Sequence, residues 1–222
     1  MTLVTKKHAS PAGRGSAEAW LDAAYQLLIS SGVESVRIVP LAHNLKLSRT
    51  SFYWFFQDRS ELLAALLERW RKKNTGNLIR QAEMYAESIT EAIFNVFDCW
   101  LDARVFDSRA EFAVRSWAQQ SDRVAQEINS ADEARIQALT QMFSRFQFDR
   151  VSADVRARTI YLTQIGYISM KVEETLATRM RRIPAYVRIF TGVSPARREL
   201  DRFHARYGFN VKVAVARQKR LT

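Results

Sequence analysis

The sequence predicts an all-α fold, and three features of its 222 residues support this prediction. Glycine and proline, which interrupt helices, number only seven and four. Apolar residues recur along most of the chain at i, i+3 or i+4, and i+7, which places them on one side of a helix. Several of these stripes follow a Ser or Asp with Glu three residues later, a capping box typical of a helix start.

Composition narrows the class of protein. Apolar residues make up 47% and charged residues 26%, as in ordinary globular proteins. No run of about 18 apolar residues could span a membrane, and the first 16 residues lack the apolar core of a signal peptide. The single Cys99 has no disulfide partner and no nearby metal ligands, so we expect it to be buried as an apolar side chain. We therefore expect a cytoplasmic protein with no metal and no cofactor.

The net charge of +11 is unevenly distributed. Residues 1–60 carry seven Lys and Arg against four Asp and Glu, residues 61–178 carry fifteen against seventeen, and residues 179–222 carry twelve against two. Such an arrangement suits either a polyanionic partner that touches part of the chain or a solvated basic surface.

No motif indicates an enzyme. The chain has no recognisable nucleophile and base pair, no paired metal-binding histidines or cysteines, and no glycine-rich phosphate loop. The three histidines, His8, His43 and His204, are far apart in sequence. We therefore expect no catalytic site.

The N-terminal region reads as four helices. Ser16 can cap the first, which stops before Gly32 and buries a stripe of apolar residues: Ala19, Trp20, Ala23, Ala24, Leu27 and Leu28. A short second helix covers 39–45, with Pro40 in its first turn. Ser48 can cap a third over 49–56, and a box of Asp58 and Glu61 starts a fourth that continues to residue 74.

The remainder of the chain predicts helices over 88–104, 109–120, 123–146, 152–176, 182–192 and 195–208. The first begins with a box of Ser88 and Glu91, and Ser152 can cap the fourth. The expected inward residues are Ile89, Ile93, Val96, Phe97 and Trp100 on the helix of 88–104, and Val155, Tyr161, Leu162, Ile165 and Ile168 on that of 152–176.

The second and third helices have the spacing of a helix-turn-helix. Ala42 is small enough for the helices to cross, and Leu47 can point inward from the turn. Phe52 and Phe56 lie four residues apart and can anchor the third helix. Its other side, with Arg49, Thr50 and Tyr53, is then free to enter a major groove of DNA.

The stretch LAHNLKLSRTSFYWFFQDRSELLAAL resembles the DNA-binding segment of the TetR (tetracycline-repressor-like) regulators, and the resemblance extends from Trp20 to Leu63. The matching positions are Leu41, Ala42, Leu47, Ser48, Phe52, Tyr53, Phe56, Leu62 and Leu63, with Arg59 in place of the usual lysine. Two positions depart from the pattern. Lys46 replaces the glycine of the turn, where a left-handed backbone would cost about 1 kcal/mol or more, and Phe55 replaces a frequent His or Tyr.

The resemblance implies a DNA-binding role for several residues. By position, Tyr53 and Arg59 are expected to contact phosphates. The planar fork of Arg49 matches guanine but could equally reach phosphate, and Trp54 can pack on the sugar–phosphate edge or wedge against its own domain. The other candidate contacts are Arg37, Lys46, Ser48, Thr50 and Ser51.

The resemblance also implies the domain organisation: an N-terminal three-helix DNA-binding domain and a C-terminal helical bundle for ligand binding and dimerisation. We expect a flexible arm over 1–15, the helix-turn-helix domain over 16–62, the effector-binding and dimerisation domain over 63–192, and a basic C-terminal helix and tail over 193–222. Candidate effector-binding residues, each of which could instead be ordinary core, are Phe97, Trp100, Arg104, Phe112, Arg115, Trp117, Tyr161, Gln164 and Tyr167.

The predicted function is that of a nucleoid-associated transcriptional regulator, most simply a repressor. A homodimer formed through the helices of about 152–191 would bind double-stranded operator DNA and be released by a small-molecule effector. The alternative is a constitutive architectural protein that coats DNA without an effector. The arginine-rich end is either a solvated helix and frayed tail or a further DNA-backbone contact; its cations are Arg197, Arg198, Arg202, Arg206, Arg217, Lys219 and Arg220.

Overall fold

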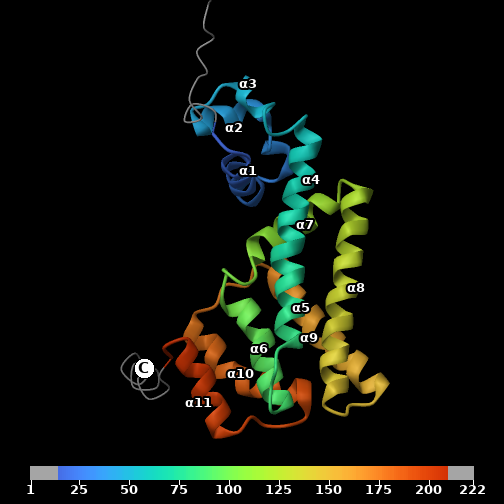
Figure 1. The fold of residues 1–222 in the computed structure, drawn as a ribbon. Helices are drawn as coiled ribbons and strands as arrows, with labels where there is room; N and C mark the ends of the chain where they lie inside the picture. Colours follow the sequence, from blue (N-terminus) through green and yellow to red (C-terminus); the bar gives the residue numbers. More distant parts are fainter. Residues whose placement is uncertain (1–14, 210–222) are drawn as a thin grey trace, which may run out of the picture. The chain divides into compact units, whose positions relative to one another are not determined.

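The computed structural model describes residues 15–209, and within them it contains helices and no strand, which confirms the predicted all-α class (Figure 1). The predicted N-terminal arm (up to residue 14) and the last part of the tail, with Arg217, Lys219 and Arg220, lie outside the described residues. None of the helices over 15–209 combines the length and apolarity needed to cross a membrane.

The described chain forms two compact units. Unit 1 contains the residues up to Arg71 together with Arg109–Ala125, and unit 2 contains Lys72–Ser108 together with the residues from Gln126 onward. The predicted domain boundary after residue 62 therefore falls inside a helix of unit 1. That helix continues to Trp70, whose buried indole Nε1 donates to the Glu111 carboxylate at 2.8 Å.

Unit 1 is built on α1, which packs against α2 and α4, while α2 packs against α3. These helices lie together in the blue and cyan part of Figure 1. Their bounds are α1 (Ala17–Ser31), α2 (Ile38–Leu45), α3 (Arg49–Phe52) and α4 (Arg59–Trp70), with a short 3-10 turn at Val33–Ser35; α7 (Ser108–Ala118) supplies most of the rest.

The predicted capping residues start these helices. The amide of Ala19 donates to the Ser16 hydroxyl, and the amide of Glu61 donates to the Asp58 carboxylate. The Glu61 carboxylate also accepts from the amide of Gln57, the residue before the cap, at 2.5 Å. A side-chain cap of this kind satisfies a backbone donor that the helix leaves without a partner.

Helix α3 is shorter than predicted, ending at Phe52 rather than at Phe56. The amides of Phe55 and Phe56 both donate to the Phe52 carbonyl, at 3.0 and 3.1 Å, so the chain turns there. Aromatic side chains lose rotamer freedom in a helix, and this turn buries both Phe52 and Phe56. Tertiary packing has therefore overridden the continuous helix that the pattern predicted.

Unit 2 contains α6 packed against α5, α10 and α11, and α9 packed against α10. Figure 1 shows the orange and red helices α10 and α11 beside the green α6. The bounds are α5 (Gly76–Glu83), α6 (Ile89–Leu101), α8 (Asp122–Arg145), α9 (Arg150–Ser169), α10 (Leu176–Thr191) and α11 (Arg197–Arg206), and a π-helical segment, Arg71–Thr75, precedes α5. The first four residues of α8 belong to unit 1.

All five inward residues predicted for α6 are buried, and so is Cys99, where burial raises the pKa of the thiol to about 12. Helix α9 differs from the prediction. Its cap is Asp149 rather than Ser152, because the Asp149 carboxylate accepts from the amides of Val151 and Ser152 at 3.0 Å each. The helix also stops at Ser169, just before Lys171 takes a left-handed backbone conformation.

The buried stripe of α9 is offset from the predicted one. Tyr161 and Ile168 are buried as expected, but Val155 and Leu162 are exposed. The core instead accepts Ala153 and Ala157, whose small side chains allow close packing with neighbouring helices. Helix α9 is thus apolar on two sides, and the sequence pattern alone could not distinguish them.

A fully buried arginine organises part of the unit 2 core. Arg135 Nε donates to the Thr75 hydroxyl at 3.0 Å, and Arg135 Nη1 donates to the Tyr161 hydroxyl at 2.8 Å. Tyr161 in turn donates to the Asp132 carboxylate at 2.6 Å. A buried charge is tolerated when its donors are satisfied in this way. These contacts make Tyr161 a structural residue.

Lys46 ends α2 in the left-handed conformation, with φ 54° and ψ 38°. Replacing Lys46 with glycine is expected to raise the free energy of unfolding by about 1 kcal/mol, because glycine has no Cβ to clash there. Urea denaturation provides the measurement. As a control, Gln26→Gly at an exposed position within α1 should lower the free energy of unfolding by about 0.5–1 kcal/mol. If K46G were no more stable than the parent protein, the strain at Lys46 would be refuted.

Candidate nucleic-acid interface and ligand pocket

The turn between α2 and α3 is held by local hydrogen bonds. The Leu47 amide donates to the Ala42 carbonyl at 2.9 Å, so the chain leaves α2 in a tight turn. Ser48 then caps α3 by accepting from the Ser51 amide at 3.2 Å. The Ser51 hydroxyl donates back to the Ser48 carbonyl at 2.7 Å, which closes the first turn of α3.

Phe52 anchors α3 to unit 1. Its ring is fully buried and meets the edge of the Trp20 ring at 5.3 Å between centroids. On its other sides it stacks on Phe56 and makes an edge contact with Tyr53, each at 5.4 Å. Aromatic contacts of this geometry add to the free energy gained by burial. The anchor therefore determines which α3 residues face outward.

The outward side of α3 carries polar, cationic and aromatic groups. Arg49 and Thr50 are exposed, Tyr53 is half exposed, and Trp54 has 64% of its surface exposed. Arg49 Nη2 donates to the Tyr53 hydroxyl at 3.3 Å, which aligns the two side chains. Within residues 15–209, neither Lys46 nor Arg49 has a carboxylate partner. This surface can therefore offer two uncompensated cations and a phenol to a polyanion.

The other predicted contact residues occupy different environments. Arg37 and Ser48 are exposed beside this surface, although Arg37 is also bonded to the Glu34 carbonyl. Ser51 is only 4% exposed and is committed to its hydrogen bond with Ser48. Because a buried hydroxyl cannot approach a base edge, Ser51 does not belong to the outward surface.

Arg59 links α4 to the segment before α2. Its Nε donates to the Val36 carbonyl at 2.6 Å, and its Nη2 donates to the Val33 carbonyl at 2.8 Å. These carbonyls belong to the 3-10 turn and its end, where the backbone has few helical partners. Arg59 therefore has a structural function in unit 1, whether or not it also reaches a phosphate.

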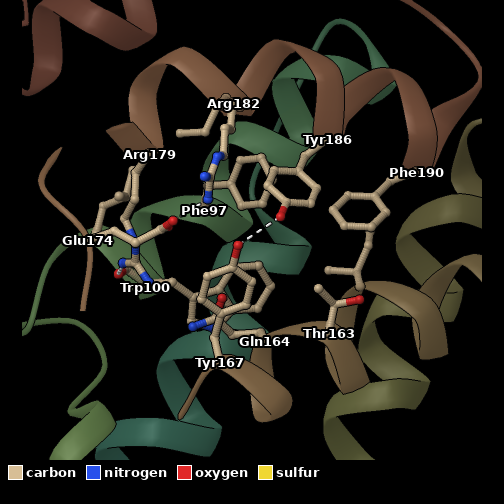
Figure 2. Close-up of a pocket in the computed structure, with 13 residues that line it drawn as sticks. Phe97, Trp100, Thr163, Gln164, Tyr167, Glu174, Arg179, Arg182, Tyr186 and Phe190 are labelled. Carbon is tan, nitrogen blue, oxygen red and sulfur yellow. Dashed lines mark hydrogen bonds and ion pairs between the residues drawn. The ribbon is translucent and has the colours of Figure 1, made fainter. Parts of the chain in front are cut away.

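Unit 2 contains a pocket of about 520 Å³, including its opening to solvent. Figure 2 shows aromatic side chains around it, with Glu174, Arg179 and Arg182 together at the end where α10 begins. A lining that is largely apolar, with a few polar groups, is typical of small-molecule sites. The lining residues are Phe97, Trp100, Leu101, Ile160, Thr163, Gln164, Tyr167, Glu174, Arg179, Arg182, Ile183, Tyr186 and Phe190.

The polar end of the pocket is internally connected. The hydroxyls of Tyr167 and Tyr186 lie 2.8 Å apart, as the dashed line in Figure 2 marks. Arg182 forms an ion pair with Glu174, and this carboxylate raises the pKa of Arg182. The hydrogen bond with Tyr167, together with burial, raises the pKa of Tyr186, so this phenol stays protonated at neutral pH.

The structure brings four of the predicted effector residues together in this pocket: Phe97, Trp100, Gln164 and Tyr167. Tyr161 is instead bonded to Arg135, and the exposed Arg104 binds the Asp102 carboxylate. Phe112, Arg115 and Trp117 belong to α7 in unit 1, where Arg115 pairs with Glu111 at 2.9 Å. These five residues do not line the pocket.

Sequence reasoning missed the contribution of α10. Arg179, Arg182, Ile183, Tyr186 and Phe190 recur at i, i+3, i+4, i+7 and i+11, so they share one side of that helix. The spacing was visible in the sequence. The predicted helix begins only at residue 182, however, so Arg179, the first residue of this pattern, falls between two predicted helices.

The arginines of α11 are largely used within unit 2. Arg202 pairs with Glu91, and Arg206 pairs with Asp98 at 2.8 Å. The Phe203 ring stacks on Phe94 with centroids 4.5 Å apart. These contacts dock α11 on α6, so α11 is packed within unit 2 and is not surrounded by solvent.

Comparisons with known proteins identify the fold. No protein-family model matches the chain, and a search of curated proteins finds no match. A transcriptional regulator from Rhodococcus sp. Rha1 aligns over 86% of this chain and 97% of its own, with 17% identity and a TM-score of 0.55. The TetR family repressor AlkX from Dietzia sp. strain DQ12-45-1b, implicated in the biodegradation of n-alkanes, aligns over 82% and 98%, with 20% identity and a TM-score of 0.45. The chain thus shares the all-helical fold of the Rhodococcus regulator.

The structural role of Arg59 leads to a stability prediction. Arg59→Gln should lower the free energy of unfolding by about 1–3 kcal/mol, because the Val36 carbonyl loses its donor and the Val33 carbonyl keeps only the amide of Val36. The control Arg37→Gln removes the same charge from an exposed side chain and should change stability by less than about 0.5 kcal/mol. Urea denaturation of both variants tests this, and equal stabilities would show that the Arg59 contacts contribute nothing.

Proposed function

We propose that this protein is a ligand-responsive, sequence-specific DNA-binding transcriptional regulator, acting as a homodimeric repressor on a pseudo-palindromic operator. The observation that carries the proposal is the outward surface of α3, where Arg49, Thr50, Tyr53 and Trp54 are exposed while Phe52 is fully buried. The shared fold with a transcriptional regulator is consistent with this proposal.

Each exposed group suits a particular part of DNA. A guanidinium such as that of Arg49 can donate two hydrogen bonds to guanine O6 and N7 in the major groove. The Tyr53 hydroxyl and the Lys46 ammonium can donate to phosphate oxygens, which position the protein without reading sequence. The hydrogen bond between Arg49 and Tyr53 would couple base reading to phosphate binding.

The homodimer is supported by an exposed apolar stripe on α9. Val151, Val155, Thr159 and Leu162 follow one another at helical spacing, and Leu162 is 59% exposed. Ile189 of α10 lies across a shallow hollow from them, and Val193 follows α10; both are exposed. A contiguous apolar surface of this kind commonly marks a contact with another chain. In a twofold dimer each copy would cover the stripe of the other.

The pocket in unit 2 supplies a place for an effector. A ligand that prefers one dimer conformation over another would change the affinity for DNA by a coupling free energy of about 1–3 kcal/mol. Release of DNA upon ligand binding would make the protein a repressor that its ligand inactivates.

DNA binding can be tested with DNA from either side of the protein's own gene, by fluorescence anisotropy over a range of salt concentrations. Arg49→Ala should weaken binding about tenfold or more, because a bidentate base contact contributes roughly 1–3 kcal/mol. The control Arg80→Ala removes an exposed arginine from α5 in unit 2 and should leave the affinity nearly unchanged. Equal losses in the two variants would indicate charge-driven coating of DNA, the architectural alternative.

The dimer can be tested by sedimentation velocity. Leu162→Asp should convert the dimer to a monomer, because it places a charge on the apolar stripe. Its helical circular dichroism should be retained, since Leu162 is exposed in the single chain. The control Tyr85→Asp alters another exposed apolar residue outside the stripe and should remain dimeric. A parent protein that sediments as a monomer would refute this interface.

A further inference from the structure

The linker between α9 and α10 sends one acidic side chain into the pocket. Residues Lys171–Thr175 connect the two helices, and Val172, Glu173 and Thr175 are exposed. Glu174 differs from them: its side chain is only 12% exposed and lines the pocket. Figure 2 shows its carboxylate directed toward Arg182.

The ion pair of Glu174 and Arg182 joins a buried carboxylate to a half-exposed guanidinium. The Arg182 side chain is 52% exposed, so water can solvate it without its partner. Glu174 has less access to water and depends more on the pair. A carboxylate from another molecule could therefore replace Glu174 at Arg182 once Glu174 turns out into solvent with its exposed neighbours.

The charge of the pocket favours an anion. Arg179 and Arg182 supply two guanidinium groups, and Glu174 is the single acidic residue among the lining residues. Arg179 has no ion-pair partner among the described residues: its Nη1 donates to the Trp100 carbonyl at 2.7 Å, and its guanidinium lies over the Tyr167 ring. When Glu174 leaves, the pocket retains two cationic groups for an incoming anion.

The walls of the pocket favour a flat apolar body. Five of the lining residues are aromatic: Phe97, Trp100, Tyr167, Tyr186 and Phe190. Tyr186 and Phe190 are stacked, with centroids 5.6 Å apart, and Phe97 and Trp100 lie 5.7 Å apart at a tilted angle. An aromatic ring can stack on such faces or direct its edge at them.

We infer that the ligand of this pocket is an aromatic carboxylate of one or two rings, and that Glu174 is a built-in competitor occupying the place of its carboxylate at Arg182. The inference rests on the proposed function, which assigns an effector to this pocket. It adds the chemical class of that effector and the exchange of carboxylates at Arg182 by which it would bind. Because Glu174 lies in the linker between α9 and α10, exchange of carboxylates would act on the segment joining the two helices that carry the proposed dimer surface.

The experiment measures binding of three probes to the full-length protein by isothermal titration calorimetry, without DNA. The probes are 1-naphthoate, neutral 1-naphthamide and cationic 1-naphthylmethylammonium, which share one aromatic body and differ in charge. We expect naphthoate to bind about tenfold or more tightly than naphthamide, the difference typical of a charged hydrogen-bonded group.

Two variants test whether Glu174 competes with the ligand for Arg182, and each has a control variant at the neighbouring residue. Glu174→Gln should tighten naphthoate binding about tenfold, because the amide competes weakly for Arg182, whereas Arg182→Gln should weaken it about tenfold. Naphthamide binding should change little in either variant. The controls Glu173→Gln and Arg181→Gln make the same charge changes one residue away, outside the pocket lining, and should keep the naphthoate affinity of the parent protein.

Three results would overturn the inference. Equal affinities for naphthoate and naphthamide, or no binding of any probe, would rule out carboxylate recognition. Tightest binding of the ammonium probe, weakened by Glu174→Gln, would show a cation site in which Glu174 is the ligand-binding group. Each of these results is independent of the DNA measurements, so failure here would leave the proposed regulator function standing.

Discussion

The burial of Phe52 against Trp20 and Phe56 is the contact on which the proposed DNA interface depends. A helix of four residues has little stability of its own, so α3 requires tertiary packing to hold its orientation. With Phe52 held inward, Arg49 and Tyr53 are exposed. The same core that stabilises unit 1 therefore determines which side chains are available to DNA.

Local signals were readable from the sequence because they depend on neighbouring residues. Ser16, Asp58 and Ser88 each cap the helix expected of them, and Lys46 adopts the left-handed conformation that its position in the turn requires. Features that depend on tertiary packing could not be predicted from the sequence. The two apolar sides of α9 look alike in the sequence, and only packing decides that Ala157 is buried while Leu162 is exposed.

The pocket shows the same limit of prediction from the sequence. Phe97 and Trp100 were identified because aromatic residues on a buried stripe stand out. Glu174 was not: the sequence predicts it within the helix of 152–176, and only the fold places it in a linker beside Arg182. In the proposed account this one side chain has two functions: it pairs with Arg182 before a ligand arrives, and it yields its place to a ligand of the same charge. Ligand binding would thus begin with an exchange of partners at Arg182.

The most direct test of the central claim, that the outward surface of α3 reads DNA, is a hydroxyl-radical footprint on DNA flanking the protein's own gene. The account predicts a discrete site with two protected patches whose centres are about one helical turn, or 10 base pairs, apart, one for each copy of α3. Protection that spreads along the DNA with rising protein concentration, without a fixed position, would contradict it.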